Sequence, residues 1–241
     1  MDNKAAVIIV GAGGIGSALF QDLCRFLPHT LDIHLVDGDT VEGKNIQRQM
    51  FSRKDLGRNK AEALQEKGTM ALGLDRIYHH AWFLEGSHQL HQIAQHYSRV
   101  TLVGAVDNHP ARRVMEAWVQ QAADKRTVYY VDCANEESRG EVVAVFADKA
   151  GVQGAFRSQV DPAVLTDDRG DPLKKSCNQL LDEGNRQVLA TNRKAAIIAL
   201  ECIDAHLKGE TPVGIVYFRE CQVPRLKGVA PGDGPTEVAA K

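Results

Sequence analysis

The chain has 241 residues, a formal net charge of −2 and 44% hydrophobic residues. This length supports one α/β domain with a sizeable core, and the near-neutral charge gives no sign of binding to nucleic acid or to an anionic membrane surface. No apolar stretch reaches the roughly 18–20 residues of a membrane span, and the N-terminus lacks the pattern of a secretory signal. We therefore expect a cytoplasmic protein.

The first predicted element is an apolar strand over residues 7–10, followed by a glycine turn and a helix over residues 17–27. The turn has the spacing Gly11-x-Gly13-x-x-Gly16. In such turns the first glycine permits a tight bend, the second lets backbone N–H groups approach a phosphate, and the third allows close helix packing. A second strand, residues 31–36, ends at Asp37, where a carboxylate can accept hydrogen bonds from ribose hydroxyls. This order predicts a nucleotide site.

A long polar segment over residues 37–51 follows the second strand, at the end of the sheet where open α/β folds bind ligands. Arg48 offers bidentate contact to phosphate, and Asn45 a neutral polar contact. A helix is predicted from residues 57–60 to about residue 72. Lys60 in its first turn is unfavourable for the helix dipole, so either a nearby anion or simple solvation must account for it.

Strands and helices continue to alternate in the middle of the chain. Residues 75–80 predict a short strand, residues 87–97 a helix, residues 99–106 a buried strand and residues 109–124 a helix. The buried strand ends at Asp107 and Asn108, on the same rim as the glycine turn. For His88, His91 and His96 we expect a solvated helix face and not a metal site.

The last third of the chain predicts a different arrangement. Residues 127–132 and 140–146 predict strands joined too closely for a crossover helix, so the second is antiparallel or at the sheet edge. Residues 151–175 predict a long, mobile loop. Residues 188–207 predict a helix, and residues 211–218 a late strand that can pair with residues 221–226. We predict an α/β fold with a Rossmann-like, mostly parallel sheet, helices on both faces and antiparallel strands at the C-terminal side, formed by residues 1–227 and followed by a disordered tail over residues 228–241.

Five separated pieces of the sequence occur together in a recognisable order. They are Gly11-Ala12-Gly13-Gly14-Ile15-Gly16, Val36-Asp37-Gly38-Asp39, Asn45-Ile46-Gln47-Arg48-Gln49, Gly57-Arg58-Asn59-Lys60 and Ala105-Val106-Asp107-Asn108. Over roughly residues 5–218 the chain resembles the superfamily of ThiF-like and MoeB-like adenylyltransferases and ubiquitin-activating enzymes. In its short, single-domain form it is most similar to small bacterial ThiF-like proteins of the kind encoded in PRTRC clusters.

This resemblance implies the chemistry of the site. It implies MgATP-dependent adenylation of the C-terminal glycine of a small ubiquitin-like or sulfur-carrier protein, carried out by a homodimer. Asp37 would bind ribose, Arg48 and Lys60 would contact phosphates, and Asp107 would help to hold Mg²⁺; Arg48, Lys60 and Asp107 would be catalytic. The full set of implied nucleotide-binding residues is Gly11, Gly13, Gly14, Gly16, Asp37, Asp39, Asn45, Arg48, Gln49, Lys60, Asp107 and Asn108.

The chain also departs from the family in ways that leave other functions open. It lacks the paired Cys-x-x-Cys motifs that bind zinc in many sulfur-carrier activators, so we expect no zinc. The helical segment that often carries a second arginine has no counterpart before residue 7. A non-catalytic, nucleotide-binding interaction platform is therefore an alternative, and an NAD-dependent oxidoreductase is another that leaves Arg48, Lys60 and Asp107 without a role.

The five cysteines are scattered, which argues against a disulfide framework. Cys177 follows the predicted loop, where relatives place a cysteine that forms a thioester or persulfide. A position at a helix start beside Lys174 and Lys175 would favour its thiolate, although an unreactive cysteine fits the position as well. We interpret Cys133 as a packing residue.

Overall fold

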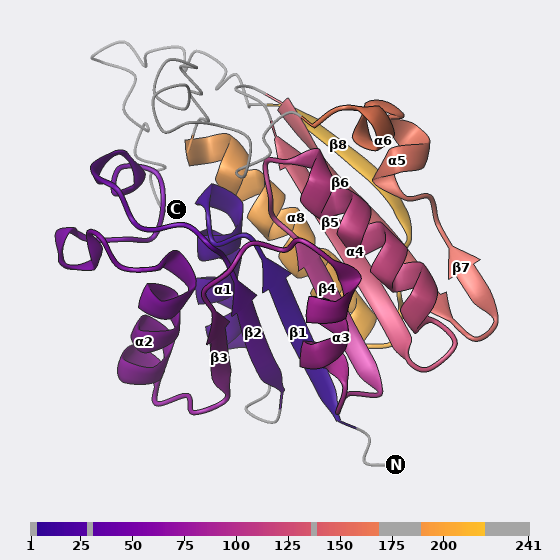
Figure 1. Cartoon of the computed structure of the whole chain (residues 1–241), viewed down its shortest axis with the longest axis horizontal. Coiled ribbons are helices and arrows are strands. Elements are labelled where there is room, and N and C mark those ends of the chain that lie inside the picture. The colour runs from indigo at the N-terminus through magenta and orange to yellow at the C-terminus, as the bar shows by residue number, and fades with distance from the viewer. Residues whose placement is uncertain (1–3, 28–30, 136–138, 169–188, 220–241) are drawn as a thin grey trace, which may run out of the picture.

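The computed structural model describes residues 4–27, 31–135, 139–168 and 189–219, which form one eight-stranded sheet with helices on both faces (Figure 1). The strand order is β3-β2-β1-β4-β5-β6-β7, and β8 pairs with β6. Strands β1 to β5 are parallel, whereas β6 is antiparallel to β5, and β7 and β8 are antiparallel to β6. The strands are Ala5–Val10 (β1), Asp32–Val36 (β2), Ile77–His80 (β3), Arg99–Gly104 (β4), Thr127–Asn135 (β5), Arg139–Asp148 (β6), Gly151–Gln153 (β7) and Gly214–Arg219 (β8). The predicted fold class, including the antiparallel strands at the C-terminal side, is confirmed.

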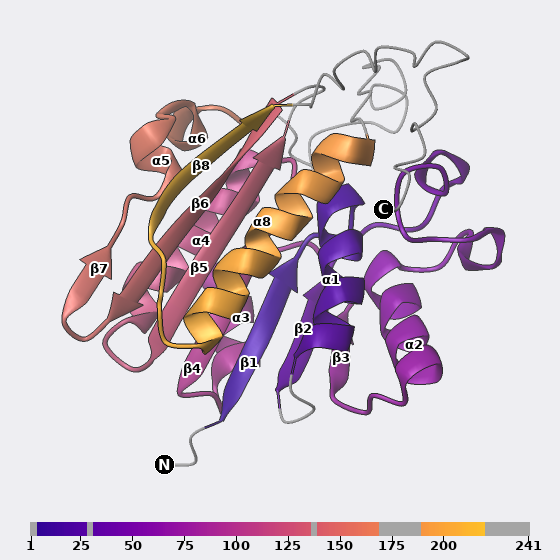
Figure 2. The same cartoon turned by 180° about the vertical axis from the view of Figure 1, so that it is seen from behind.

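Two clusters of buried side chains hold the helices to opposite faces of the sheet, because successive strand residues point to opposite sides. Ile9 and Leu35 face α1, α2 and α8, which cover the face seen in Figure 2. Ile8 and Val10 face α3 and α4 on the other side. The helices are Gly14–Phe26 (α1), Lys60–Leu72 (α2), Ser87–Ala94 (α3), His109–Ala122 (α4), Arg157–Val160 (α5), Ala163–Thr166 (α6) and Leu189–Leu207 (α8), with 3-10 turns at Gly43–Asn45 (η1) and Arg53–Asp55 (η2).

No helix within the described part of the chain combines the length and the apolar character needed to cross a lipid bilayer. The structure therefore shows no helical membrane span in these residues.

Residues 151–168 are structured, and the prediction of a continuous loop is wrong for them. They contain β7, α5 and α6, and Phe156, Arg157 and Val164 are buried. Arg113 of α4 donates to the carbonyl oxygen of Val164 at 2.8 Å, which fixes α6 against α4. These three buried side chains thus hold a segment of otherwise polar composition against the rest of the domain. Residues 169–175, Cys177, residues 221–226 and the tail over residues 228–241 lie outside the described residues.

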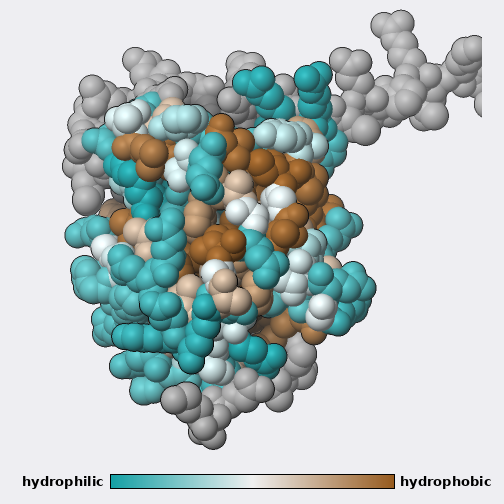
Figure 3. Space-filling model, turned by 90° about the vertical axis from the view of Figure 1, so that its right-hand side faces the viewer, coloured by the Kyte–Doolittle hydropathy of each residue, from teal (hydrophilic) through white to brown (hydrophobic). Residues whose placement is uncertain are grey.

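β8 and β7 lie one after the other along β6 and form the outer edge of the sheet. Apolar side chains on these two strands, and just before β8, are exposed. They are Val152, Val213, Val216 and Tyr217, and Tyr217 is 68% exposed. Figure 3 shows apolar side chains gathered on this side of the molecule, with hydrophilic ones around them. An exposed apolar edge strand is a surface on which another chain can pair.

A buried carboxylate ties α4, β5 and α5 together. Asp132 of β5 is fully buried, and one of its oxygens lies 3.3 Å from Arg112 Nε and also accepts from Arg157 Nε. Arg112 Nη2 donates further to the carbonyl oxygen of Val106 at 2.6 Å, and Arg157 pairs with Glu141. Arg112 therefore fixes the backbone immediately before Asp107 to the core of the sheet.

We expect Arg112→Ala to lower the free energy of unfolding by roughly 3–5 kcal/mol, because it removes one partner of a buried ion pair. Lys208→Ala is the control, since Lys208 is largely exposed and its pair with Asp204 is worth about 1 kcal/mol or less. Urea unfolding of both variants measures the difference. Equal losses in the two variants would contradict a special role for the buried pair.

Candidate functional site

The glycine turn after β1 brings the N-terminus of α1 close to the rim of the sheet. Gly11 has φ +96°, and a Cβ there would lie 2.5 Å from the carbonyl oxygen of Ala105. A Cβ at Gly16 would lie 1.8 Å from the carbonyl oxygen of Gly11, so the predicted close packing at Gly16 is confirmed. A Cβ at Gly13 would meet nothing within 4 Å. Gly13 is therefore the position at which the turn is open to an approaching group.

Asp37 connects the glycine turn to the loop after β2. Its Oδ2 accepts from the Ala12 N–H at 2.6 Å and its Oδ1 from the Asp39 N–H at 2.8 Å. Desolvation raises the pKa of the Asp37 carboxyl, while Lys60 and the two backbone N–H groups oppose this rise. A carboxylate has about four lone-pair positions, so two remain for ribose hydroxyls. The predicted role of Asp37 thus fits its geometry.

Lys60 begins α2 and is buried, with 7% of its surface exposed. Its Nζ donates to Asp39 Oδ2 at 2.8 Å. Burial alone would lower the pKa of Lys60, but the carboxylates of Asp37, Asp39 and Asp107 raise it above its ordinary value. The interpretation of a solvated lysine is wrong, because these three carboxylates account for its position at the helix start.

Asp107 and Asn108 follow β4 and differ in their surroundings. Asp107 is exposed at the rim and lies within electrostatic reach of Lys60. Asn108 is buried, and its Oδ1 accepts from the Ala111 N–H at 2.9 Å, which caps α4. The structure therefore gives Asn108 a structural task, whereas Asp107 presents a carboxylate to the site.

The loop that carries Arg48 is anchored beside the first turn of α1. Asn45 is buried, and its Oδ1 accepts from the Glu42 N–H at 2.8 Å. The backbone N–H groups of Arg48 and Gln49 donate to the Asn45 carbonyl oxygen, and the Met50 N–H donates to Ser17 Oγ at 3.2 Å. Asn45 thus shapes the loop, and the Met50 contact keeps Arg48 near the glycine turn.

Asn192 of α8 is a site residue that the sequence did not indicate. A Cβ at Gly14 would lie 2.2 Å from Asn192 Nδ2, so only glycine leaves room for this side chain. Asn192 is fully buried, and its Oδ1 accepts from Asn135 Nδ2 at 2.7 Å. Its Nδ2 has no hydrogen-bond partner within the described part of the chain. Asn192 stands beside Thr191, Arg193 and Lys194 in the sequence, so no local pattern distinguished it as a contact of the glycine turn.

The charges at the rim suit a magnesium nucleotide. Asp39 and Asp107 are exposed carboxylates, and they would repel a polyphosphate that arrived without a cation. The described residues contain no cluster of three or more His, Cys, Asp or Glu side chains arranged for a metal. Mg²⁺ in nucleotide sites commonly has only one or two carboxylate ligands and takes the others from phosphates and water. The exposed carboxylate of Asp107 is therefore suited to bind Mg²⁺ together with the phosphates of a nucleotide.

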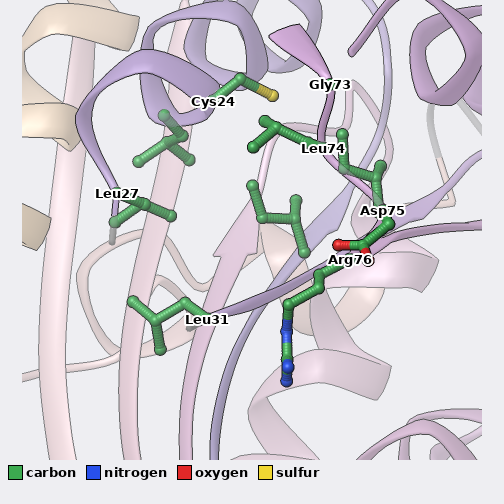
Figure 4. Close-up of a pocket in the computed structure, with 10 residues that line it drawn as sticks. Cys24, Leu27, Leu31, Gly73, Leu74, Asp75 and Arg76 are labelled. Carbon is green, nitrogen blue, oxygen red and sulfur yellow. The ribbon is translucent and has the colours of Figure 1, made fainter. Parts of the chain in front are cut away.

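A crevice at the opposite end of the sheet is unsuited to a nucleotide. It has about 40 Å³ of free space and is lined by Cys24, Leu27, Leu31 and Leu74 among others (Figure 4). Burial raises the pKa of the Cys24 thiol to about 12. Cys133 is also fully buried, which confirms its predicted role in packing.

Comparisons with known proteins place this site in a family. The ThiF family matches residues 3–212. The Nedd8-activating enzyme E1 catalytic subunit of Drosophila melanogaster is 43% identical over 63 residues, which are 26% of this chain and 14% of that protein. The corresponding subunit of Saccharomyces cerevisiae is 37% identical over 81 residues, 33% of this chain and 26% of that protein. The chain thus spans about a quarter or less of these relatives.

Solved structures with the same fold cover much more of the chain. Escherichia coli MccB with ATP has a TM-score of 0.64 at 16% identity, covering 94% of this chain and 67% of that one. PaaA has a TM-score of 0.58 at 16% identity, covering 90% of this chain and 61% of that one. The match over residues 3–212 shows that this chain belongs to the ThiF family.

Proposed function

We propose that this protein uses MgATP to adenylate the C-terminal carboxylate of a small protein or peptide. The observation that carries this proposal is the position of Lys60, which is buried, donates to Asp39 and lies within electrostatic reach of Asp37 and Asp107, beside the open glycine turn. A purely structural turn would not require a buried lysine beside three carboxylates, two of them exposed at the rim. An oxidoreductase would leave Lys60 and Asp107 without a function.

The residues of the chain would bind and orient the nucleotide. The free N–H groups at the start of α1 and the positive end of its dipole favour a phosphate at Gly13. Asn192 Nδ2, a buried donor beside Gly14, can donate to the same group. The remaining lone pairs of Asp37 would accept from the ribose.

Attack of a carboxylate on the α-phosphate releases pyrophosphate, so negative charge grows on the transferring and leaving oxygens. Lys60 and Arg48 would stabilise this charge, and a low-dielectric, preorganised site makes such stabilisation strong. Mg²⁺ shared with Asp107 would neutralise part of the phosphate charge. No side-chain nucleophile is needed, because the carboxylate of the substrate attacks.

The relatives support a protein or peptide as the second substrate. Curated relatives activate NEDD8, and MccB has been solved with ATP and with MccA. We propose a small ubiquitin-like or sulfur-carrier protein that ends in glycine, because a residue without a side chain can approach the nucleotide closely.

ATP–pyrophosphate exchange with candidate carrier proteins tests the proposed reaction. Lys60→Ala should reduce exchange roughly 100-fold or more, since it removes a charge that acts on the transition state. Lys54→Ala is the matched control, because Lys54 is exposed on η2, and it should leave exchange unchanged. EDTA should abolish exchange in the unaltered protein.

The outcomes separate the proposal from its alternatives. ATP binding without exchange for any carrier would favour a non-catalytic platform. Binding of NADH but not of ATP would contradict adenylation altogether.

We further propose that the Cys177 thiolate attacks the acyl adenylate in a second step, which forms a thioester and releases AMP. Burial raises the pKa of Cys24 to about 12 and raises the pKa of Cys133 and Cys202, so these thiols are poor nucleophiles. Iodoacetamide at pH 8 should label Cys177 in the folded protein and spare Cys24 and Cys133, as measured by peptide mass spectrometry. Denatured protein, in which all cysteines react, is the control, and labelling of Cys177 no faster than Cys24 would overturn its role.

We also propose that the protein is a homodimer that pairs through the outer edge at β8. A strand can pair antiparallel with its own copy about a two-fold axis, and the exposed Val216 and Tyr217 would be covered. Tyr217→Glu should halve the mass measured by light scattering, whereas Met70→Glu, on the exposed surface of α2, should not. A mass of 26.4 kDa for the unaltered chain would refute the dimer.

A further inference from the structure

A pocket of about 370 Å³ lies over β2 and β3, away from the glycine turn. Figure 1 shows these two strands in view on the face that carries α3 and α4. The pocket is lined by the aromatic side chains of Tyr78, Trp82 and Tyr97, by the imidazole of His80 and by the amides of Gln92 and Gln95. Nothing in the proposed adenylation uses it.

A directed chain of hydrogen bonds forms the floor of this pocket. Tyr97 Oη donates to Asp32 Oδ2 at 2.6 Å, and Asp32 also pairs with Arg76. His34 Nε2 lies 3.0 Å from Tyr97 Oη, and His34 Nδ1 lies 3.0 Å from His80 Nε2. Four side chains from β2, β3 and the segment before β4 are thus linked in series.

The order of donors in this chain follows from the chemistry of each group. The only hydroxyl proton of Tyr97 goes to Asp32, so Tyr97 Oη must accept from His34 Nε2–H. Burial and the neighbouring His80 lower the pKa of His34 to about 4, so His34 is neutral at pH 7 and its Nδ1 accepts from His80 Nε2–H. Burial also lowers the pKa of His80. His80 therefore holds its proton at Nε2 and has a lone pair at Nδ1.

The lone pair of His80 Nδ1 is available to a ligand. The ring of His80 lines the pocket. Among the described residues, Nδ1 has no hydrogen-bond partner. It does not belong to the buried polar atoms that lack a partner, so it is accessible from the pocket. The His80 and Trp82 rings lie 5.4 Å apart between centroids, so a flat molecule that reaches Nδ1 also meets the indole. None of the lining residues is an acid, a lysine or an arginine.

We infer that this pocket binds an uncharged, planar heterocycle that donates a ring N–H to His80 Nδ1. Trp82 and Tyr78 would contact its faces, and the side-chain amides of Gln92 and Gln95 can donate to or accept from its other edge. A phosphate or a carboxylate would find no lysine or arginine among the lining side chains.

This site is distinct from the nucleotide site at the rim. His34 and His80 point to the face of the sheet that packs against α3 and α4, as the neighbouring Val36 does. Lys60 begins α2, whose buried residues pack on the opposite face. A backbone hydrogen bond joins the two places, because the Asp37 N–H donates to the His80 carbonyl oxygen at 3.1 Å.

Titration with benzimidazole, followed by NMR of the indole N–H groups, tests the inference. The chain has two tryptophans, and the buried Trp118 donates its indole N–H to His91, so only the Trp82 signal should shift. 1-Methylbenzimidazole has the same ring without the N–H and should bind about tenfold more weakly, which corresponds to one hydrogen bond. This ligand pair tests the contact in the unaltered protein.

Matched variants on β3 locate the contact. His80→Phe keeps a ring but removes the acceptor and should weaken benzimidazole binding about tenfold. His79→Phe changes the neighbouring residue on the opposite face, which contacts Gln65 of α2, and should leave binding unchanged. Saturating MgATP should not displace benzimidazole.

Three results would overturn the inference. They are equal affinity for the two ligands, unchanged binding in His80→Phe, and displacement by MgATP, which would place the heterocycle in the nucleotide site.

Discussion

The carboxylate of Asp37 is the contact on which the rest of the rim depends. It accepts one N–H from the glycine turn and one from the loop after β2, so it joins two segments that lie 25 residues apart in the sequence. Asp39, held by this contact, in turn pairs with Lys60 at the start of α2. Because backbone donors fix both oxygens of Asp37, the positions of the turn, the loop and the helix start are coupled. A ligand at the rim meets a surface that is already organised.

Buried charge is arranged differently on the two sides of Asp107. On the side of β2, Lys60 pairs with Asp39 and lies within electrostatic reach of Asp37 and of Asp107 itself, and Asp39 and Asp107 are exposed at the rim. On the side of β5, Asp132 is fully buried and pairs with Arg112 and Arg157. The first arrangement is open and can exchange partners with phosphates or a cation. The second is closed, and a closed ion pair holds backbone in place instead of binding a ligand.

Local patterns predicted the elements well where hydrophobic periodicity is strong. β1 and β4 follow from continuous apolar runs and α8 from apolar residues with a period of about 3.6. The short link before β6 already indicated a strand that is antiparallel or at the sheet edge, and β6 is antiparallel to β5. The prediction failed over residues 151–168, where three buried side chains stand among aspartates and prolines. Arg157 looks like a surface residue in the sequence, and only its pairing with Asp132 makes it part of the core.

The sequence by itself determined the family resemblance, the order of strands and helices outside residues 151–168, and the identity of the residues at the carboxyl ends of β1, β2 and β4. These depend on spacing along the chain, which the sequence contains directly. Tertiary structure alone decided that Asn192 occupies the space beside Gly14, that Lys60 is buried and pairs with Asp39, and that His34 connects Tyr97 to His80. Each of these contacts joins side chains 20 or more residues apart. The physical reason is that a side chain's partners depend on how the sheet and helices pack, which local spacing does not specify.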